Sequence, residues 1–185
     1  MRHDATVPSA TAYPQWSYYP RNTEPAPWAL SIVQVVADAE PRVSTPSGVK
    51  KSSDAVLLEL APGLRALGYD VEAGKRAADK ITRPVLYGDS GSVRVKYEID
   101  GWHPELGVAV EVEAGRGAAS NADYRDIVRM SLLLDAKFMC LLLPQVYRST
   151  KQTWHAFRNT NEQLDAIYAS QRLRLPFEGV LLVGY

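Results

Sequence analysis

The sequence has little cysteine and histidine, and neither sign of charge is in excess. Its single cysteine, Cys140, lies in the apolar run 138–143, so we expect a core residue and neither a disulfide nor a cysteine-based zinc site. The three histidines, His3, His103 and His155, show no metal-ligand spacing. The 21 basic residues balance 21 acidic ones, so any polyanion must be attracted by a local basic patch.

Long hydrophobic runs are also absent. No stretch approaches the roughly 20 apolar residues of a transmembrane helix, and the N-terminus lacks the apolar core of a signal peptide. Residues 115–117 are too short a glycine pattern to predict nucleotide binding. With 185 residues, of which 46% are hydrophobic, the chain can form one sizeable core. We therefore expect a single-domain, soluble, cytoplasmic protein with no membrane partner.

Residues 1–27 differ in composition from the rest of the chain. They hold five of the twelve prolines together with Tyr13, Trp16, Tyr18 and Tyr19, which disfavours a helix or a central strand. We interpret this segment as an extended leader or arm, with its aromatic residues packed on the same chain or on a second subunit. A tail without fixed structure is the alternative. The main domain is then expected over residues 28–185.

Residues 93–114 are the most informative stretch, because apolar and polar residues alternate along them. Apolar side chains occupy every second position from Val93 to Ile99 and again from Val108 to Ala114, as in two half-buried strands. The turn-rich residues 101–107 between them predict a hairpin.

This hairpin brings four acidic residues together. Centred on its loop, it places Asp100 opposite Glu111 and Glu98 opposite Glu113. Like charges that face each other across a ladder destabilise a sheet by roughly 0.2–1 kcal/mol per pair. A divalent cation such as Mg²⁺ removes the conflict, because carboxylates, water and phosphate oxygens are its ligands. The alternative is a solvated polar face, balanced by the basic residues of the first strand.

Periodicity predicts helices and strands on both sides of the hairpin. The expected elements are helices 27–39 and 53–67, a strand 69–73, a helix from Ser120, a buried strand 138–143, a helix 153–171 and a strand 179–184. Residues 74–92 are expected to form a connector with a break at Pro84. In the helix after Ser120, Tyr124 and Val128 are expected to face the sheet. Helical crossovers make the strands they join parallel, so the pattern predicts an α/β fold.

One group of residues resembles a known family. Ile99-Asp100, ten intervening residues and then Glu111-Val112-Glu113 at a strand end resemble the signature of the PD-(D/E)xK nuclease superfamily, over about residues 53–143. The resemblance implies a restriction-endonuclease-like fold, in which helices flank a mixed central β-sheet. It also implies a nuclease-like domain over residues 28–185. Glu113 replaces the usual lysine and Ile99 a proline, and this Glu-x-Glu version is similar to BamHI-like type II restriction endonucleases.

The resemblance implies a metal site and a reaction. Asp100 and Glu111 are expected to hold Mg²⁺, or Mn²⁺ as a substitute, with the Val112 carbonyl as a further ligand. Glu59, in the helix before the strands, is a further metal candidate by position, and Glu98 ranks behind it. The expected function is a Mg²⁺-dependent endonuclease that hydrolyses phosphodiester bonds in DNA, such as a restriction or defence nuclease. The alternative is an inactive nuclease-fold protein that binds nucleic acid or a protein partner.

Roles for the remaining residues follow from the chemistry. Water attacks phosphorus, so the site must stabilise the developing charge and accept a proton. Glu113 is expected to orient or deprotonate the water or to bind a second metal, and Lys96 is the candidate for the missing lysine. DNA is the expected partner, with RNA left open, and type II enzymes commonly act as homodimers. Phosphate contacts are expected from Arg116, Arg125, Arg129, Arg148 and Lys151.

Overall fold

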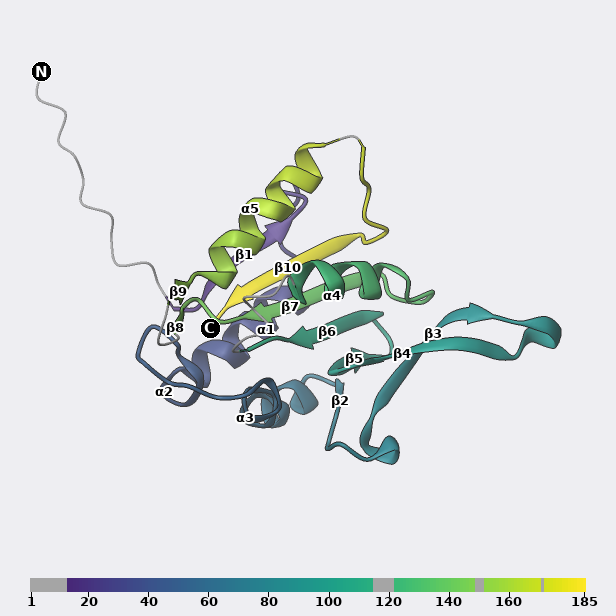
Figure 1. Cartoon of the computed structure of the whole chain (residues 1–185), viewed down its shortest axis with the longest axis horizontal. Helices are drawn as coiled ribbons and strands as arrows, with labels where there is room; N and C mark the ends of the chain where they lie inside the picture. Colours follow the sequence, from purple (N-terminus) through teal and green to yellow (C-terminus); the bar gives the residue numbers. More distant parts are fainter. Residues whose placement is uncertain (1–12, 115–121, 149–151, 171) are drawn as a thin grey trace, which may run out of the picture.

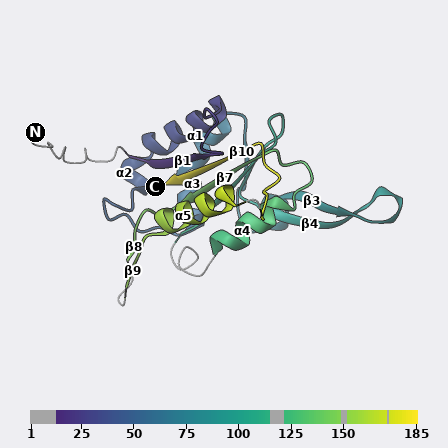
Figure 2. The ribbon, with the colours of Figure 1, turned by 90° about the horizontal axis from the view of Figure 1, so that it is seen from above.

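The central feature of the computed structural model, which describes residues 13–114, 122–148, 152–170 and 172–185, is a mixed β-sheet. Within these residues, six strands form it in the order β1-β10-β7-β6-β5-β2. Helices α1 and α3 cover one face, and α4 and α5 cover the other (Figures 1 and 2). The predicted α/β class, a mixed central sheet flanked by helices, is confirmed.

Helices and strands alternate along much of the described chain. In chain order they are β1 (Gln15–Tyr19), α1 (Pro27–Asp38), α2 (Glu40–Val43), α3 (Ser53–Ala66), β2 (Asp70–Val71), β3 (Ile81–Tyr87), β4 (Val93–Ile99), β5 (Gly101–His103), β6 (Val108–Val112), α4 (Ala122–Ser131), β7 (Phe138–Leu143), β8 (Tyr147–Arg148), β9 (Thr153–Trp154), α5 (Ala156–Ala169) and β10 (Gly179–Gly184). Short 3₁₀ turns, η1 (Ala77–Asp79) and η2 (Asp89–Gly91), flank β3. None of the helices in the described ranges is long and apolar enough to cross a membrane.

The parallel strands β6, β7 and β10 form the centre of the core. On one face of the sheet Val110, Cys140 and Leu181 pack with α1 and α3. On the other face Ala109 and Leu141 pack with α4 and α5. Burial on both faces explains why β7 and β10 are almost continuously apolar. Cys140 is a buried free thiol in this core, as predicted.

Strand β1 lies within the segment predicted as a leader. It pairs antiparallel with β10 at the sheet edge. The hydroxyl oxygen of the buried Tyr19 lies 2.9 Å from both Asn161 O and Asp165 Oδ1 of α5, which share its one hydrogen. Tyr18 packs on Trp28 of α1, with ring centroids 6.1 Å apart. Residues 15–19 are therefore an edge strand held by aromatic side chains, while residues 1–12 lie outside the described part of the chain.

The predicted hairpin is shorter than expected, and its first strand is β5 (residues 101–103), which was predicted as part of the turn. β5 and β6 pair antiparallel, with Gly101 opposite Val110, which keeps the predicted register. Asp100 follows in the same register and forms the bend at which β4 leaves the sheet. A Cβ at position 101 would lie 3.2 Å from Val110 Cβ, so glycine permits the close approach of the strands at this bend.

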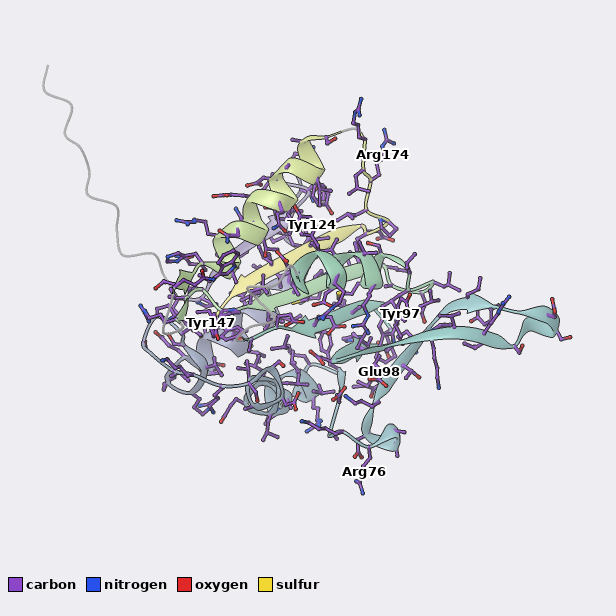
Figure 3. All side chains as sticks on the ribbon, in the orientation of Figure 1. Arg76, Tyr97, Glu98, Tyr124, Tyr147 and Arg174 are labelled. Atoms are coloured by element: carbon purple, nitrogen blue, oxygen red, sulfur yellow. The ribbon has the colours of Figure 1, made fainter. Side chains whose placement is uncertain are left out.

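The outer part of the predicted hairpin is wrong. β4 pairs instead with β3 in a two-stranded ribbon that extends from the body (Figure 1), and Glu98 faces Thr82 rather than Glu113. Glu98 lies where the ribbon joins the body (Figure 3). β3 replaces the predicted connector. Its Pro84 is tolerated because the register shifts next to it, in a ribbon whose β3 has no second neighbour.

Helix α4 is rotated relative to the prediction. Asp126 and Asp123 are buried, whereas Tyr124 and Val128 are 46% and 58% exposed. Burying a carboxylate is costly unless it is paired, and both have partners: Asp123 accepts a hydrogen bond and Asp126 forms ion pairs with arginines. The predicted cap, Ser120, lies outside the described residues.

The N-cap of α3 is Ser52, the residue before the predicted start of this helix at residue 53. The Ser52 hydroxyl accepts a hydrogen bond from Ala55 N at 3.3 Å. We expect Ser52→Ala to lower the free energy of unfolding by about 1 kcal/mol, because it leaves this N–H without its partner. Ser53→Ala should cost less. Urea denaturation with unchanged m-values measures both, and equal losses would contradict the assignment of the cap.

Candidate active site

Asp100 and Glu111 lie side by side where the ribbon meets the sheet. Asp100 Oδ2 accepts a hydrogen bond from Val112 N at 2.8 Å. This bond extends the β5–β6 ladder by one step, with a side chain in place of a backbone acceptor, and fixes the carboxylate. Glu111 is only 8% exposed. Glu111 and Ala109 are two residues apart on β6, so their side chains point to the same face of the sheet, which is the face that α4 covers.

The two carboxyl groups perturb each other strongly. Burial raises the pKa of Asp100 to about 6, although the hydrogen bond from Val112 lowers it. Burial also raises the pKa of Glu111 well above its usual range, and the charges of Asp100 and Asp126 raise it further. Burial is the largest cause for both groups, because a dry site disfavours the charged form of a carboxyl group.

Glu113 lies at the edge of the same cluster. Burial raises the pKa of Glu113 to about 8, and the hydrogen bond and charge of Asp126 contribute further. Arg125 bridges the two acids: Nη2 donates to Glu113 Oε1 at 2.6 Å, and Nε donates to Asp126 Oδ1 at 3.0 Å. Arg129 Nη1 lies 3.8 Å from Asp126 Oδ1.

Asp126 is a fourth acidic member of this cluster that the sequence analysis missed. The prediction that Tyr124 and Val128 face the sheet uses apolar residues alone and so does not select Asp126. Asp123, Asp126, Ile127 and Met130, all buried, have the same helical spacing of three or four residues. This spacing identifies Asp126 as a buried residue of the helix only if acidic residues are counted on the buried face together with apolar ones.

A lysine also lies near the cluster. Lys80, before β3, has its Nζ 2.6 Å from Glu72 Oε1 and 3.8 Å from Glu98 Oε2. The hydrogen bond with Glu72 raises the pKa of Lys80, with smaller contributions from the charges of Glu72, Glu98 and Asp100. Residues 74–92 were predicted to form a connector, which gave no reason to select Lys80. Lys80 lies near Glu98 because β3, which follows Lys80, pairs with β4.

Two other predicted residues are not brought to this cluster. Glu59 on α3 pairs with Lys51 at 2.5 Å and with Arg42 at 3.0 Å. Lys96 is exposed on β4 opposite Pro84. In the described ranges, no hydrogen bond or ion pair joins either residue to the acids at the sheet.

The basic residues predicted to bind DNA fall into three groups. Arg116 and Lys151 lie outside the described residues. Arg125 and Arg129 both contact Asp126. Arg148 is exposed on β8 and lines a cavity.

The pair Asp100 and Glu111 has the donor chemistry that Mg²⁺ requires. This ion is usually held by one or two carboxylates, with water and substrate phosphate completing an octahedron. A cation would offset the cost of ionising two buried carboxyl groups, which is the main reason that the pKa of both is raised. A cage of three or more histidine, cysteine, aspartate or glutamate ligands is not found among the described residues. The residues therefore fit an ion that is shared with water and substrate.

The fold and the acidic cluster define the class of protein. A six-stranded mixed sheet flanked by helices, with paired carboxylates at Asp100 and Glu111, is the arrangement of a restriction-endonuclease-like protein. The family described as "Putative halobacteria restriction endonuclease" has a model that matches residues 6–185, so the chain belongs to that family. No curated protein matches the chain. The similarity to BamHI-like enzymes stays a prediction.

Proposed function

We propose that this chain is an endonuclease that hydrolyses phosphodiester bonds in DNA, with Mg²⁺ held by Asp100 and Glu111. The observation that carries the proposal is the buried pair itself. Two acids whose pKa values are raised by burial lie side by side, and a backbone hydrogen bond from Val112 fixes the Asp100 carboxylate. Membership of a restriction-endonuclease family supports a nuclease. The bound Mg²⁺ and the DNA substrate are the parts of the proposal that go beyond this family membership.

The residues of the chain have distinct parts in this reaction. When bound, Mg²⁺ supplies positive charge to the phosphorus centre and acidifies water. Asp100 and Glu111 hold the ion, and the Val112 carbonyl is a further ligand. Glu113, oriented by Arg125, positions the attacking water or accepts its proton. The positive charge that the superfamily usually takes from lysine comes from Lys96 or, by proximity to Asp100, from Lys80.

A cleavage assay tests the proposal. Purified protein is incubated with supercoiled plasmid, linear duplex or single-stranded RNA, in Mg²⁺, Mn²⁺ or EDTA. We expect conversion of plasmid to nicked and linear forms with Mg²⁺ or Mn²⁺ and none with EDTA. Cleavage that persists in EDTA, or none of any substrate, contradicts the proposal. Metal-independent DNA binding without cleavage is the result expected for the inactive alternative. Light scattering tests the homodimer, which stays a prediction.

A further inference from the structure

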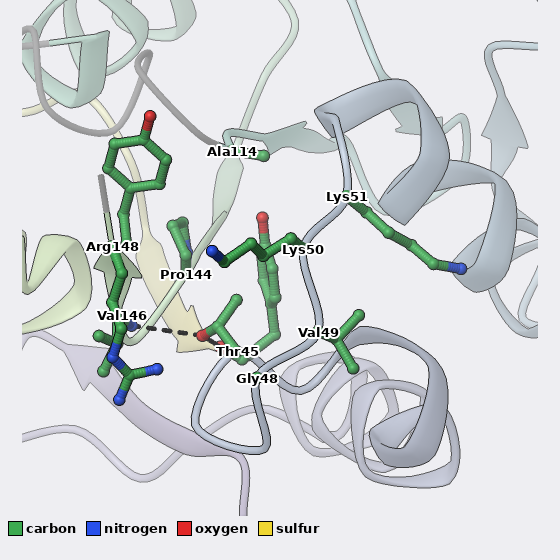
Figure 4. A pocket seen from close by; sticks show the side chains of 11 residues that line it. Thr45, Gly48, Val49, Lys50, Lys51, Ala114, Pro144, Val146 and Arg148 are labelled. Atoms are coloured by element: carbon green, nitrogen blue, oxygen red, sulfur yellow. Dashed lines mark hydrogen bonds between the residues drawn. The ribbon is translucent and has the colours of Figure 1, made fainter. Parts of the chain in front are cut away.

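A small cavity opens beside the carboxyl ends of β6, β7 and β10 (Figure 4). Its walls come from the loop that follows α2 and from the segment that follows β7, with Tyr185 after β10. The cavity volume is about 80 Å³. Sites for whole small molecules have volumes of about 300–1,000 Å³, so this cavity fits a group of phosphate size.

Hydrogen bonds hold the walls of this cavity together. Thr45 Oγ1 donates to Tyr185 O at 2.5 Å and accepts from Val146 N at 3.3 Å. One hydroxyl therefore joins the loop after α2, the end of β10 and the segment after β7, and Figure 4 shows Thr45 between these segments. Gln145 N also donates to Tyr185 O, at 2.9 Å. The walls are thus fixed before a ligand binds.

Two basic residues on separate walls of the cavity have no acidic partner within the described ranges. Lys50 comes from the loop after α2 and Arg148 from β8 (Figure 4), and both are exposed. Lys51, which also lines the cavity, is neutralised by Glu59 at 2.5 Å. Unpaired cations around a preformed hollow attract phosphate, whatever the net charge of the chain.

Tyr185 connects this cavity to the acidic cluster. Its hydroxyl donates to the backbone carbonyl of Glu113 at 2.6 Å. Ala114, the next residue after Glu113, lines the cavity. The end of β6 therefore contributes a side chain to the proposed active site and a wall to the cavity. A nucleic-acid strand that follows the end of β6 from Asp100 and Glu111 would reach this cavity.

We propose that this cavity binds a backbone phosphate of the DNA strand being cleaved, next to the scissile phosphodiester, with Lys50 and Arg148 as the residues that bind it. The inference rests on the proposed function, because it assigns a substrate contact to the same enzyme. Contacts to phosphate carry no sequence information. The cavity therefore sets the register of the strand over the carboxylates and does not select the sequence.

DNA binding by the double variant Lys50→Ala/Arg148→Ala tests this assignment. Affinity for a fluorescein-labelled duplex is measured by anisotropy in Ca²⁺ and in EDTA over a series of salt concentrations. The variant should bind roughly 10- to 100-fold more weakly at moderate salt, and the slope of log K against log salt should become shallower by about 0.9, the contribution of one phosphate contact.

The matched control is Arg172→Ala/Arg174→Ala, which removes the same charge from two exposed residues. Both precede β10, and Arg174 lies at the far end of that strand from the cavity (Figures 1 and 3). Equal effects of the two double variants, no effect of Lys50→Ala/Arg148→Ala, or no DNA binding by the wild type would overturn the assignment. A wild type that binds as expected but does not cleave with Mg²⁺ contradicts only the proposed nuclease activity.

Discussion

In a plasmid assay with Mg²⁺, we expect Glu111→Gln to cleave DNA about 10³-fold more slowly than the wild type. The change removes a metal ligand, and with it several kcal/mol of transition-state stabilisation. Glutamine keeps the volume of the buried side chain and removes a charge that Asp100 and Asp126 repel. We therefore expect the variant to remain folded, with a midpoint of thermal unfolding at or above that of the wild type.

Glu162→Gln is the matched control for this experiment. It makes the same chemical change on an exposed position of α5. Its cleavage rate should equal that of the wild type. A similar loss of activity in both variants, or full activity of Glu111→Gln, would contradict the assignment of Glu111 as a metal ligand.

We expect the metal-free protein to lose stability as the pH rises from about 4 to 8. Burial raises the pKa of Asp100 to about 6 and of Glu113 to about 8, and it raises the pKa of Glu111. A carboxyl group whose pKa is higher in the folded chain stabilises the fold fully below its unfolded pKa, near 4. That stabilisation disappears as the pH rises through the folded pKa.

The expected size of this effect is measurable. For Asp100 the change in pKa corresponds to a loss on the order of 3 kcal/mol, or roughly 6–12 °C in the unfolding midpoint of a domain of this length. Differential scanning fluorimetry in EDTA over this pH range measures it. Millimolar Mg²⁺ should restore the midpoint at pH 8, because it binds the ionised pair.

Glu111→Gln should show a flatter pH dependence than the wild type, whereas Glu162→Gln should follow the wild type. A metal-free midpoint that stays constant or rises between pH 5 and 8 would contradict the perturbed pKa values of the cluster. A fall in the midpoint that Mg²⁺ does not reverse would contradict the metal site.

The sequence predicted the part of the fold that depends on local pattern. The buried strands β7 and β10 are continuous apolar runs because both of their faces are covered. The register of β5 and β6 follows from the loop that joins them, and it places Asp100 beside Glu111. These are the features on which the candidate site depends, so its two central acids could be selected without a structure.

The rest depends on partners that are distant in sequence. The alternation over residues 93–99 fits any neighbouring strand, and the choice of β3 over β6 is made by tertiary pairing. The rotation of α4 depends on Thr160 of α5, which donates to Asp123 at 2.8 Å. The cavity of Lys50 and Arg148 exists because the ends of β6 and β10 meet two loops. The periodicity of the sequence predicts none of these contacts.

The position of a bound Mn²⁺ ion tests the proposed metal centre most directly. Crystals grown at pH 8 with Mn²⁺ in place of Mg²⁺ give an anomalous signal at each bound ion. We expect a peak between the carboxylates of Asp100 and Glu111, about 2.0–2.2 Å from their oxygens, and no peak there in Glu111→Gln. The absence of an ion at this pair in the wild type, or a peak only elsewhere, such as at Glu59, would contradict the proposed metal centre.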